Sequence, residues 1–290
     1  MIQVLINTMS SASLIALIAL SFWFVYAPTR TFYFSHAAAI PLGAYGTYYL
    51  QSRLNFCTVF ATGFSVLAIA AFFVCVDFLL LRHFRSNSKG WTGLVASIGL
   101  YAVLQNLISL AFGDETLLLH AGRVQLGQKV GNGFMAPSQE VIVVVSVLAF
   151  CFCGLLLFGT KLGRGIRAVA SNQSLALIFG ISPTRVVSYA IAIGCALAAL
   201  GGVLYAYDMD LKPRMGFPLL MRGVVALIVA GVGSISGLIY AAFLLALAQN
   251  LTAYFFGVQW MDTVTYSVLI VFLMWRPLGF KGDAIRRIEA

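Results

Sequence analysis

The chain is dominated by long apolar runs that alternate with short polar stretches. Nine such runs are present, with approximate bounds 12–28, 36–50, 58–81, 91–112, 141–160, 186–207, 217–230, 237–256 and 263–275. A membrane-spanning helix needs about 20 predominantly apolar residues, so the pattern predicts membrane helices. The runs 36–50 and 217–230 are short for a hydrocarbon core of about 30 Å, and Pro or Gly stands at or near their ends, as in broken or re-entrant helices. Each of these two segments is therefore interpreted as a full crossing or as a half-span.

The composition supports this interpretation and limits the domain count. Of 290 residues, 61% are hydrophobic and 9% are charged, whereas soluble domains carry about 25% charged residues. At about 20 residues per span, the length allows roughly eight to ten spans and leaves no room for a separate soluble domain. We predict an all-α fold, a polytopic membrane helix bundle of about eight to nine hydrophobic segments, with one transmembrane domain over residues 1–290.

The net charge of +9 is spread between the apolar runs, which is typical of topology signals and argues against nucleic-acid binding. If all nine runs cross and the N-terminus lies outside, twelve of the 18 Lys and Arg residues lie inside and six of the nine acids lie outside. We therefore predict an outside N-terminus and a cytoplasmic C-terminus. The stretch 161–185 and the C-terminus carry most of the inside basic residues.

No catalytic constellation is present. The three His residues form no H-E-x-x-H pair, no phosphate-binding G-x-x-x-x-G-K-[ST] loop or G-x-S-x-G elbow occurs, and the five Cys residues lack metal or redox spacing. The chain is not expected to be an enzyme, to hydrolyse ATP by itself or to bind a metal or cofactor. The acid Asp77, near the end of a span, is interpreted either as an ion pair with Arg82 or Arg85 or as a functional membrane carboxylate.

The polar stretch from Lys161 to Arg185 predicts a short amphipathic helix. Ser171 or Asn172 can cap it, Gly180 can end it, and its apolar side chains are Leu175, Ala176, Ile178 and Phe179. Such a helix either lies on the membrane surface or docks into a groove on a cytoplasmic partner. The glycine cluster Gly231 to Gly237 likewise has two interpretations, tight helix packing and the lining of a cavity.

Four stretches carry short motifs in a fixed order. They are Phe34-Ser35-His36 with Leu42-Gly43-Ala44-Tyr45; Gly163-Arg164, Arg167-Ala168-Val169-Ala170, Asn172, Ala176 and Gly180-Ile181; Gly231-Val232-Gly233-Ser234-Ile235 with Gly237; and Arg276-Pro277-Leu278-Gly279. Together they resemble the motifs of permeases in the branched-chain (hydrophobic) amino acid family of ABC importers. The second stretch resembles that family's coupling loop, which seats on an ATPase.

The resemblance implies one permease subunit of an ATP-driven importer in a bacterial or archaeal cytoplasmic (inner) membrane, surrounded by membrane lipid. It implies a second homologous permease, two cytoplasmic ATPase subunits that use the ATP, and an extracytoplasmic substrate-binding protein. The implied ATPase-coupling residues are Arg164, Arg167, Ala168, Asn172, Ala176 and Gly180. The implied candidates for the translocation path are His36, Gly43, Gly231, Gly233, Ser234, Gly237 and Gln249. For His36, a contact in the path and a hydrogen bond to a neighbouring helix carbonyl are both open.

The sequence departs from the family pattern at positions that bear on the substrate. Ala37 and Ala38 follow His36 where the family usually has Gly and often an acid, and Gln249 stands where the family usually has Glu. Branched-chain or other hydrophobic amino acids are the expected substrates, and an amide, urea or a sugar is the alternative within ABC permeases. A secondary transporter or channel for a small solute is the alternative of another class, although more charged coupling sites would be expected in it.

Overall fold

The computed structural model of the protein describes residues 1–81, 90–119, 127–130, 133–231, 233–276 and 279. The nine apolar runs form helices α1 (Ile2–Thr29), α2 (Ala39–Leu54), α3 (Thr58–Val76), α5 (Gly90–Phe112), α6 (Pro137–Gly159), α9 (Pro183–Asp208), α10 (Gly216–Ala230), α11 (Ile235–Phe255) and α12 (Met261–Trp275). The shorter elements are η1 (Phe34–Ala38), the π-helical turn η2 (Asp77–Leu81), α7 (Lys161–Ser171), α8 (Gln173–Ile178), η3 (Pro213–Met215), η4 (Val258–Trp260) and an antiparallel hairpin of β1 (Gln128–Val130) and β2 (Gly133–Met135).

The predicted all-α membrane bundle is confirmed. In the described part of the chain, eight helices are long and apolar enough to cross a membrane, and α2 is the helix among the nine that is too short. Helix α1 begins at Ile2, well before the predicted start at residue 12. The side chains of its polar first turns have hydrogen-bond partners: Thr8 donates to the carbonyl of Val4 one turn earlier, and Gln3 donates to the carbonyl of Phe134 in the distant strand β2.

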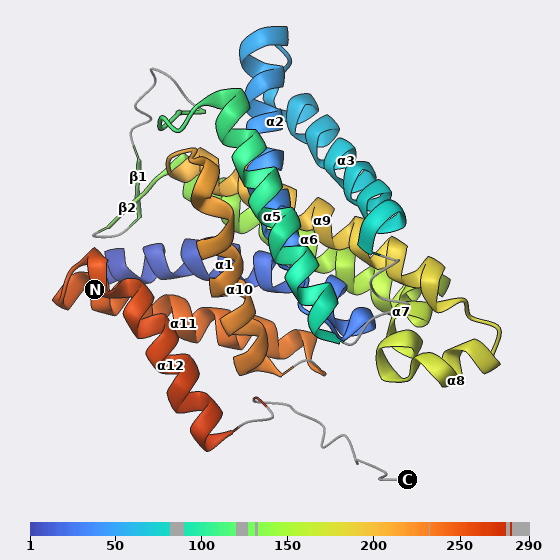
Figure 1. The fold of residues 1–290 in the computed structure, drawn as a ribbon. Helices are drawn as coiled ribbons and strands as arrows, with labels where there is room; N and C mark the ends of the chain where they lie inside the picture. Colours follow the sequence, from blue (N-terminus) through green and yellow to red (C-terminus); the bar gives the residue numbers. More distant parts are fainter. Residues whose placement is uncertain (82–89, 120–126, 131–132, 232, 277–278, 280–290) are drawn as a thin grey trace.

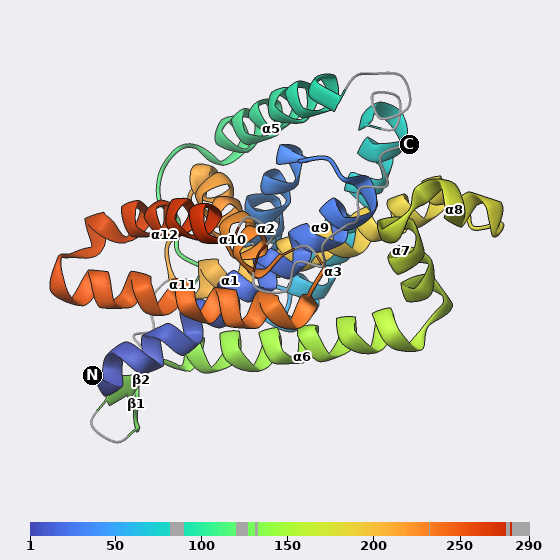
Figure 2. The same cartoon turned by 90° about the horizontal axis from the view of Figure 1, so that it is seen from below.

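The helices run between two ends of the bundle, which we name by what lies there. The hairpin end holds the start of α1, the β1–β2 hairpin, the start of α6 and the end of α9. It is held together by the bond from Gln3 to Phe134 and by Ser138, whose hydroxyl donates to Asp208 at 2.8 Å. The α8 end holds α7, α8 and the end of α1 (Figures 1 and 2).

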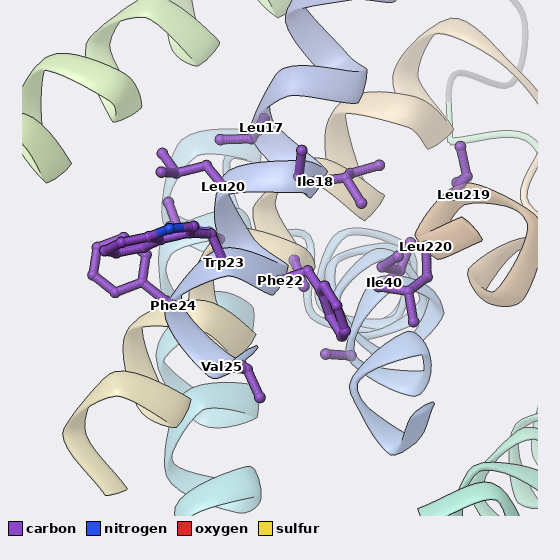
Figure 3. Packing of buried hydrophobic residues seen from close by; sticks show 14 of the residues in the cluster. Leu17, Ile18, Leu20, Phe22, Trp23, Phe24, Val25, Ile40, Leu219 and Leu220 are labelled. Atoms are coloured by element: carbon purple, nitrogen blue, oxygen red, sulfur yellow. The ribbon is translucent and has the colours of Figure 1, made fainter. Parts of the chain in front are cut away.

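Helix α1 forms the centre of the bundle. It packs against α6, α9, α10 and α11. Leu17, Leu20 and Phe24 point to one side of the helix and Ile18 and Phe22 to the other, and all five side chains are buried (Figure 3). A helix that is apolar on all sides is buried either in a protein core or in a membrane, and α1 is surrounded by other helices. This central position makes α1 the element through which movements at the two ends can reach most other helices.

Small residues set the distance between α2 and α9. A Cβ atom added to Gly43 would lie 2.6 Å from the Cα atom of Ala199, which is too close for a side chain. In membranes, where the lipid is as apolar as the side chains, such close backbone approach is a main source of helix association. The α2–α9 contact is therefore a tight packing interface.

The short segment before α2 is a broken helix. The chain leaves α1 at Arg30, returns into the bundle and forms η1, where His36 contacts Ser21 of α1. Ser21 lies eight residues before the end of α1, which corresponds to about 12 Å along the helix axis. Helix α2 thus starts inside the membrane and ends at the hairpin end. The second short segment, α10, is lengthened by η3, and Pro213–Ala230 together reaches the length of a span.

Candidate functional site

The segment from α7 to Gly180 is the first candidate site, and local sequence signals explain its shape. The hydroxyl of Thr160 accepts from the backbone N–H of Gly163 and caps α7, and the side chain of Asn172 accepts from the N–H of Leu175 and caps α8. Gly180 has a positive φ of 78°, and its N–H donates to the carbonyl of Leu177, as in left-handed helix ends. The predicted capping by Asn172 and the predicted end at Gly180 are confirmed, whereas the α7 helix was not predicted.

Helix α8 exposes a cluster of large apolar side chains, the α8 apolar face, which consists of Leu175, Leu177, Ile178 and Phe179. Ile178 and Phe179 are 78% and 80% exposed, whereas Ala176 is 3% exposed and packs inward. The predicted apolar face was therefore wrong at one residue. Ala176, which was assigned to it, packs α8 against the bundle, and Leu177 takes its place in the exposed cluster. At an end outside the spans, such a cluster marks an interaction site.

Two hydrogen bonds connect the α7–α8 segment to the end of α1. The side-chain amide of Gln173 donates to the carbonyl of Pro28 at 2.6 Å, and the Arg30 guanidinium donates to the carbonyl of Ala170 at 2.6 Å. Sequence reasoning missed both anchors because they join positions about 140 residues apart. The α8 apolar face is thus mechanically linked to the central helix.

The other predicted coupling residues lie on α7. Arg164 and Arg167 are exposed, and Ala168 is half-buried. The Arg167 guanidinium lies over the ring of Phe158 at 4.9 Å from the ring centroid, a cation–π contact that fixes its stem beside α6. Arg164 is available for a partner at the α8 end.

The predicted path residues His36 and Gly43 lie in the packed interior. The Nε2 atom of His36 is 3.1 Å from the Ser21 hydroxyl, and its Nδ1 atom is 3.4 Å from the Cys195 sulfur. The two ring nitrogens therefore contact side chains of α1 and α9. Neither makes the hydrogen bond to a neighbouring helix carbonyl that was one of the two interpretations of His36 from the sequence. The Gly43 carbonyl accepts from Thr47 and from Ser65 of α3.

The glycine cluster forms the turn between α10 and α11 and meets the C-terminal motif. Gly231 ends α10 with φ 82°, and the hydroxyl of Ser234 caps α11 by accepting from the N–H of Gly237. A Cβ atom on Gly279 would lie 2.5 Å from the Gly231 backbone. Two motifs that are separate in the sequence therefore form one contact, which leaves no space for a side chain at Gly279. Gly233 lies exposed on this turn.

Two further polar groups lie inside the helical part. Gln249 of α11 is 1% exposed, and its amide donates to the hydroxyl of Thr265 of α12 at 2.6 Å. Asp77 is fully buried, and Ser188 of α9 donates to its carboxylate at 3.0 Å. The predicted ion-pair partners Arg82 and Arg85 lie outside the described residues. The site candidates thus form two groups: one at the α8 end and one dispersed among the helix contacts.

Comparison with known proteins places this arrangement in a family. The model of the family described as "Branched-chain amino acid transport system / permease component" matches residues 4–274. The high-affinity branched-chain amino acid transport system permease protein LivH of Escherichia coli K12 is 28% identical and aligns over 97% of this chain and 95% of its own. The corresponding BraD protein of Pseudomonas aeruginosa gives the same identity and coverage. A probable LivH of Methanocaldococcus jannaschii is 22% identical over 96% of this chain and 91% of its own.

These matches extend over nearly the whole chain, and with the apolar helices they identify a multi-pass protein of the inner membrane. The chain belongs to the family of permease components of branched-chain amino acid transport systems.

Proposed function

We propose that this permease forms half of the translocation path of an ATP-driven importer for branched-chain or other hydrophobic amino acids. A second homologous permease forms the other half, two cytoplasmic ATPase subunits bind and use the ATP, and an extracytoplasmic binding protein delivers the substrate. This chain holds no cofactor in the proposal. The observation that carries it is the α8 apolar face, exposed at one end of the bundle and bonded to the central helix α1.

The α8 apolar face fits the groove of a protein partner. Leu175, Ile178 and Phe179 stand at positions i, i+3 and i+4 of a short, capped helix, which is the spacing by which amphipathic helices dock into grooves. Arg164 and Arg167 are exposed on the preceding helix α7 and suit an acidic surface of the same partner. The relatives whose names refer to branched-chain amino acid transport support the choice of substrate.

The charge distribution supports a cytoplasmic α8 end and an outside N-terminus. The bases near the α8 end are Arg30, Lys161, Arg164, Arg167, Arg185 and Arg276, and Asp77 is the acid described there. Among the described residues, the hairpin end carries the acids Asp114, Glu115, Glu140, Asp208, Asp210 and Asp262 beside the five bases Arg53, Lys129, Lys212, Arg214 and Arg222. Because short loops rich in Lys and Arg stay in the cytoplasm, α8 faces the ATPases and the hairpin end faces the binding protein.

In this proposal, the residues predicted for the translocation path remain assigned to it. The turn that contains Gly231, Gly233, Ser234 and Gly237 lies toward the cytoplasmic mouth. His36, Gly43 and Gln249 fix the positions of helices α2, α9, α11 and α12, and so shape the path that forms against the second permease.

The test is purification of the tagged chain in mild detergent, followed by uptake of radiolabelled leucine into proteoliposomes. We expect an ATPase and a related permease to co-purify, and we expect uptake to require ATP and the binding protein and to be competed by isoleucine and valine. If only urea, an amide or ribose competes with the uptake, the substrate belongs to that class and not to the hydrophobic amino acids. Uptake by this chain alone without ATP would establish a secondary transporter or channel and refute the proposal.

A further inference from the structure

A groove with a volume of about 700 Å³ lies at the hairpin end between α3, α6 and α9. Helix α9 forms its floor with Leu200, Val203 and Leu204, and the first turns of α3 and α6 form its walls. Val59 and Val141 on these walls are exposed, so the groove opens sideways from the bundle. Its interior is apolar along most of its length.

The rim of the groove is polar and lies where the helices end. Thr58, Ser138 and Tyr207 contribute one hydroxyl from each of the three helices. The Gln51 amide donates to the hydroxyls of Thr58 and Tyr207, and Ser138 donates to the carboxylate of Asp208. The groove is therefore amphiphilic, with an apolar interior, a hydroxyl-lined rim and one carboxylate beside the rim.

The depth of the groove matches one leaflet of a bilayer. Val145 lies eight residues after the start of α6 at Pro137, and Leu200 lies eight residues before the end of α9 at Asp208. Eight residues correspond to about 12 Å along a helix, and one leaflet contributes about half of a hydrocarbon core of about 30 Å. A spanning helix of another subunit would need a groove along the full core, which these residues do not form.

The transported solute is also a poor fit for this groove. The described residues that line it include no charged side chain, whereas an amino acid carries two charges that need partners when they leave water. We propose that the groove binds one acyl chain of a phospholipid from the leaflet at the hairpin end, with an amine headgroup near Asp208. The Thr58 hydroxyl, which accepts from Gln51, donates to a headgroup oxygen, and the ammonium group pairs with the Asp208 carboxylate.

The test uses the full chain with the subunits that co-purify in mild detergent. Native mass spectrometry, together with quantification of extracted lipid, measures the phosphatidylethanolamine and phosphatidylglycerol bound per chain. The variant Gly63→Leu fills the groove, because Gly63 lines it and a Cβ atom there meets nothing within 4 Å. Gly154→Leu is the matched control, because Gly154 on α6 has the same open surroundings and lies outside the groove.

We expect the native chain and Gly154→Leu to retain phosphatidylethanolamine and Gly63→Leu to retain about tenfold less, since displacing two methylene groups from apolar contact changes affinity by about that factor. Asp208→Asn should remove the preference for phosphatidylethanolamine over phosphatidylglycerol.

Absence of bound lipid from the native chain, or equal loss in both glycine variants, would overturn the site. Loss of a co-purifying subunit instead of lipid from Gly63→Leu would identify a protein occupant and would also overturn it. An unchanged headgroup preference in Asp208→Asn would overturn the role of the carboxylate.

Discussion

Substitution of Phe179 by Asp tests whether the α8 apolar face docks on a protein partner. Phe179 is 80% exposed in this chain, so almost the whole side chain is available to a groove. Burial of a Phe side chain contributes about 1.5–3 kcal/mol, and leaving an unpaired carboxylate in its place costs roughly another 1–3 kcal/mol. The sum of about 2.5–6 kcal/mol predicts a loss of roughly two to four orders of magnitude in affinity for the ATPase.

The same substitution should leave the permease itself intact. An exposed side chain makes few contacts within the chain, and surface substitutions away from structural features change stability by about 0.5 kcal/mol or less. Phe179→Asp should therefore insert in the membrane and unfold in detergent at the same temperature as the unsubstituted chain. It should lose the co-purifying ATPase and ATP-dependent uptake. Phe179→Leu is the matched control, because it retains an apolar side chain of similar reach and should retain most of the uptake.

The outcome also separates docking from the alternative that α8 lies on the membrane surface. If α8 rests on lipid, Phe179→Asp weakens the contact with the headgroup region and leaves the ATPase bound. Normal ATPase recovery and normal uptake in Phe179→Asp would refute the docking assignment. Reduced recovery in Phe179→Leu to the same level as in Phe179→Asp would show that shape, and not apolar burial, determines the contact.

Three other outcomes follow from the structure. Gly43→Ala should lower thermal stability in detergent by about 1–3 kcal/mol because the α2–α9 contact has no room for a methyl group, whereas Gly99→Ala, which meets open space on α5, should leave it unchanged or slightly raised. Gln249→Leu should cost about 1 kcal/mol, measured by thermal unfolding, since it removes a buried bond between α11 and α12; an unchanged stability with altered substrate preference would instead place Gln249 in the path. Cys57, exposed at the hairpin end, should react with a membrane-impermeant maleimide added to intact cells, whereas Ser174→Cys on α8, introduced together with Cys57→Ser, should react only after permeabilisation; the reverse pattern would invert the proposed orientation.

Most of the helix boundaries could be predicted because apolar runs in a membrane protein are set by the thickness of the bilayer. The end of α10 at Ala230 was predicted to the residue, and that of α11 within one residue, because a glycine, Gly231 or Gly257, follows closely in each case. The start of α1 could not be predicted, since Gln3 and Thr8 look like a polar leader until their bonding partners in space are known. The β1–β2 hairpin was missed for a related reason: three-residue strands give no periodic pattern.

The candidate site was predictable in its local chemistry and not in its contacts. Asn172 and Gly180 indicate a capped helix because capping depends on residues that are close along the chain. The anchors of that helix join Gln173 to Pro28 and Arg30 to Ala170, and such pairs depend on the tertiary arrangement alone. For the same reason, the contact between Gly231 and Gly279 emerged only from the fold.

The energetics of coupling show why α8 cannot act through its two anchors alone. Reversal of a two-state equilibrium from 1:99 to 99:1 takes about 5.5 kcal/mol. A neutral hydrogen bond such as that from Gln173 contributes about 0.5–1.5 kcal/mol, and a charged one such as that from Arg30 contributes about 1.5–3 kcal/mol. The sum of these two contributions is smaller than about 5.5 kcal/mol. A rigid connection between α8 and the bundle must therefore transmit the rest of this free energy. The α6–α7 turn provides it, because Gly163 packs directly against the backbone of Leu156 and Leu157 with no space for a side chain. In the proposed coupling, we expect a displacement of α8 to move α6 together with α1. We expect the end of α1 to yield first, because Pro28 lacks an N–H and leaves the last turn without one helical bond.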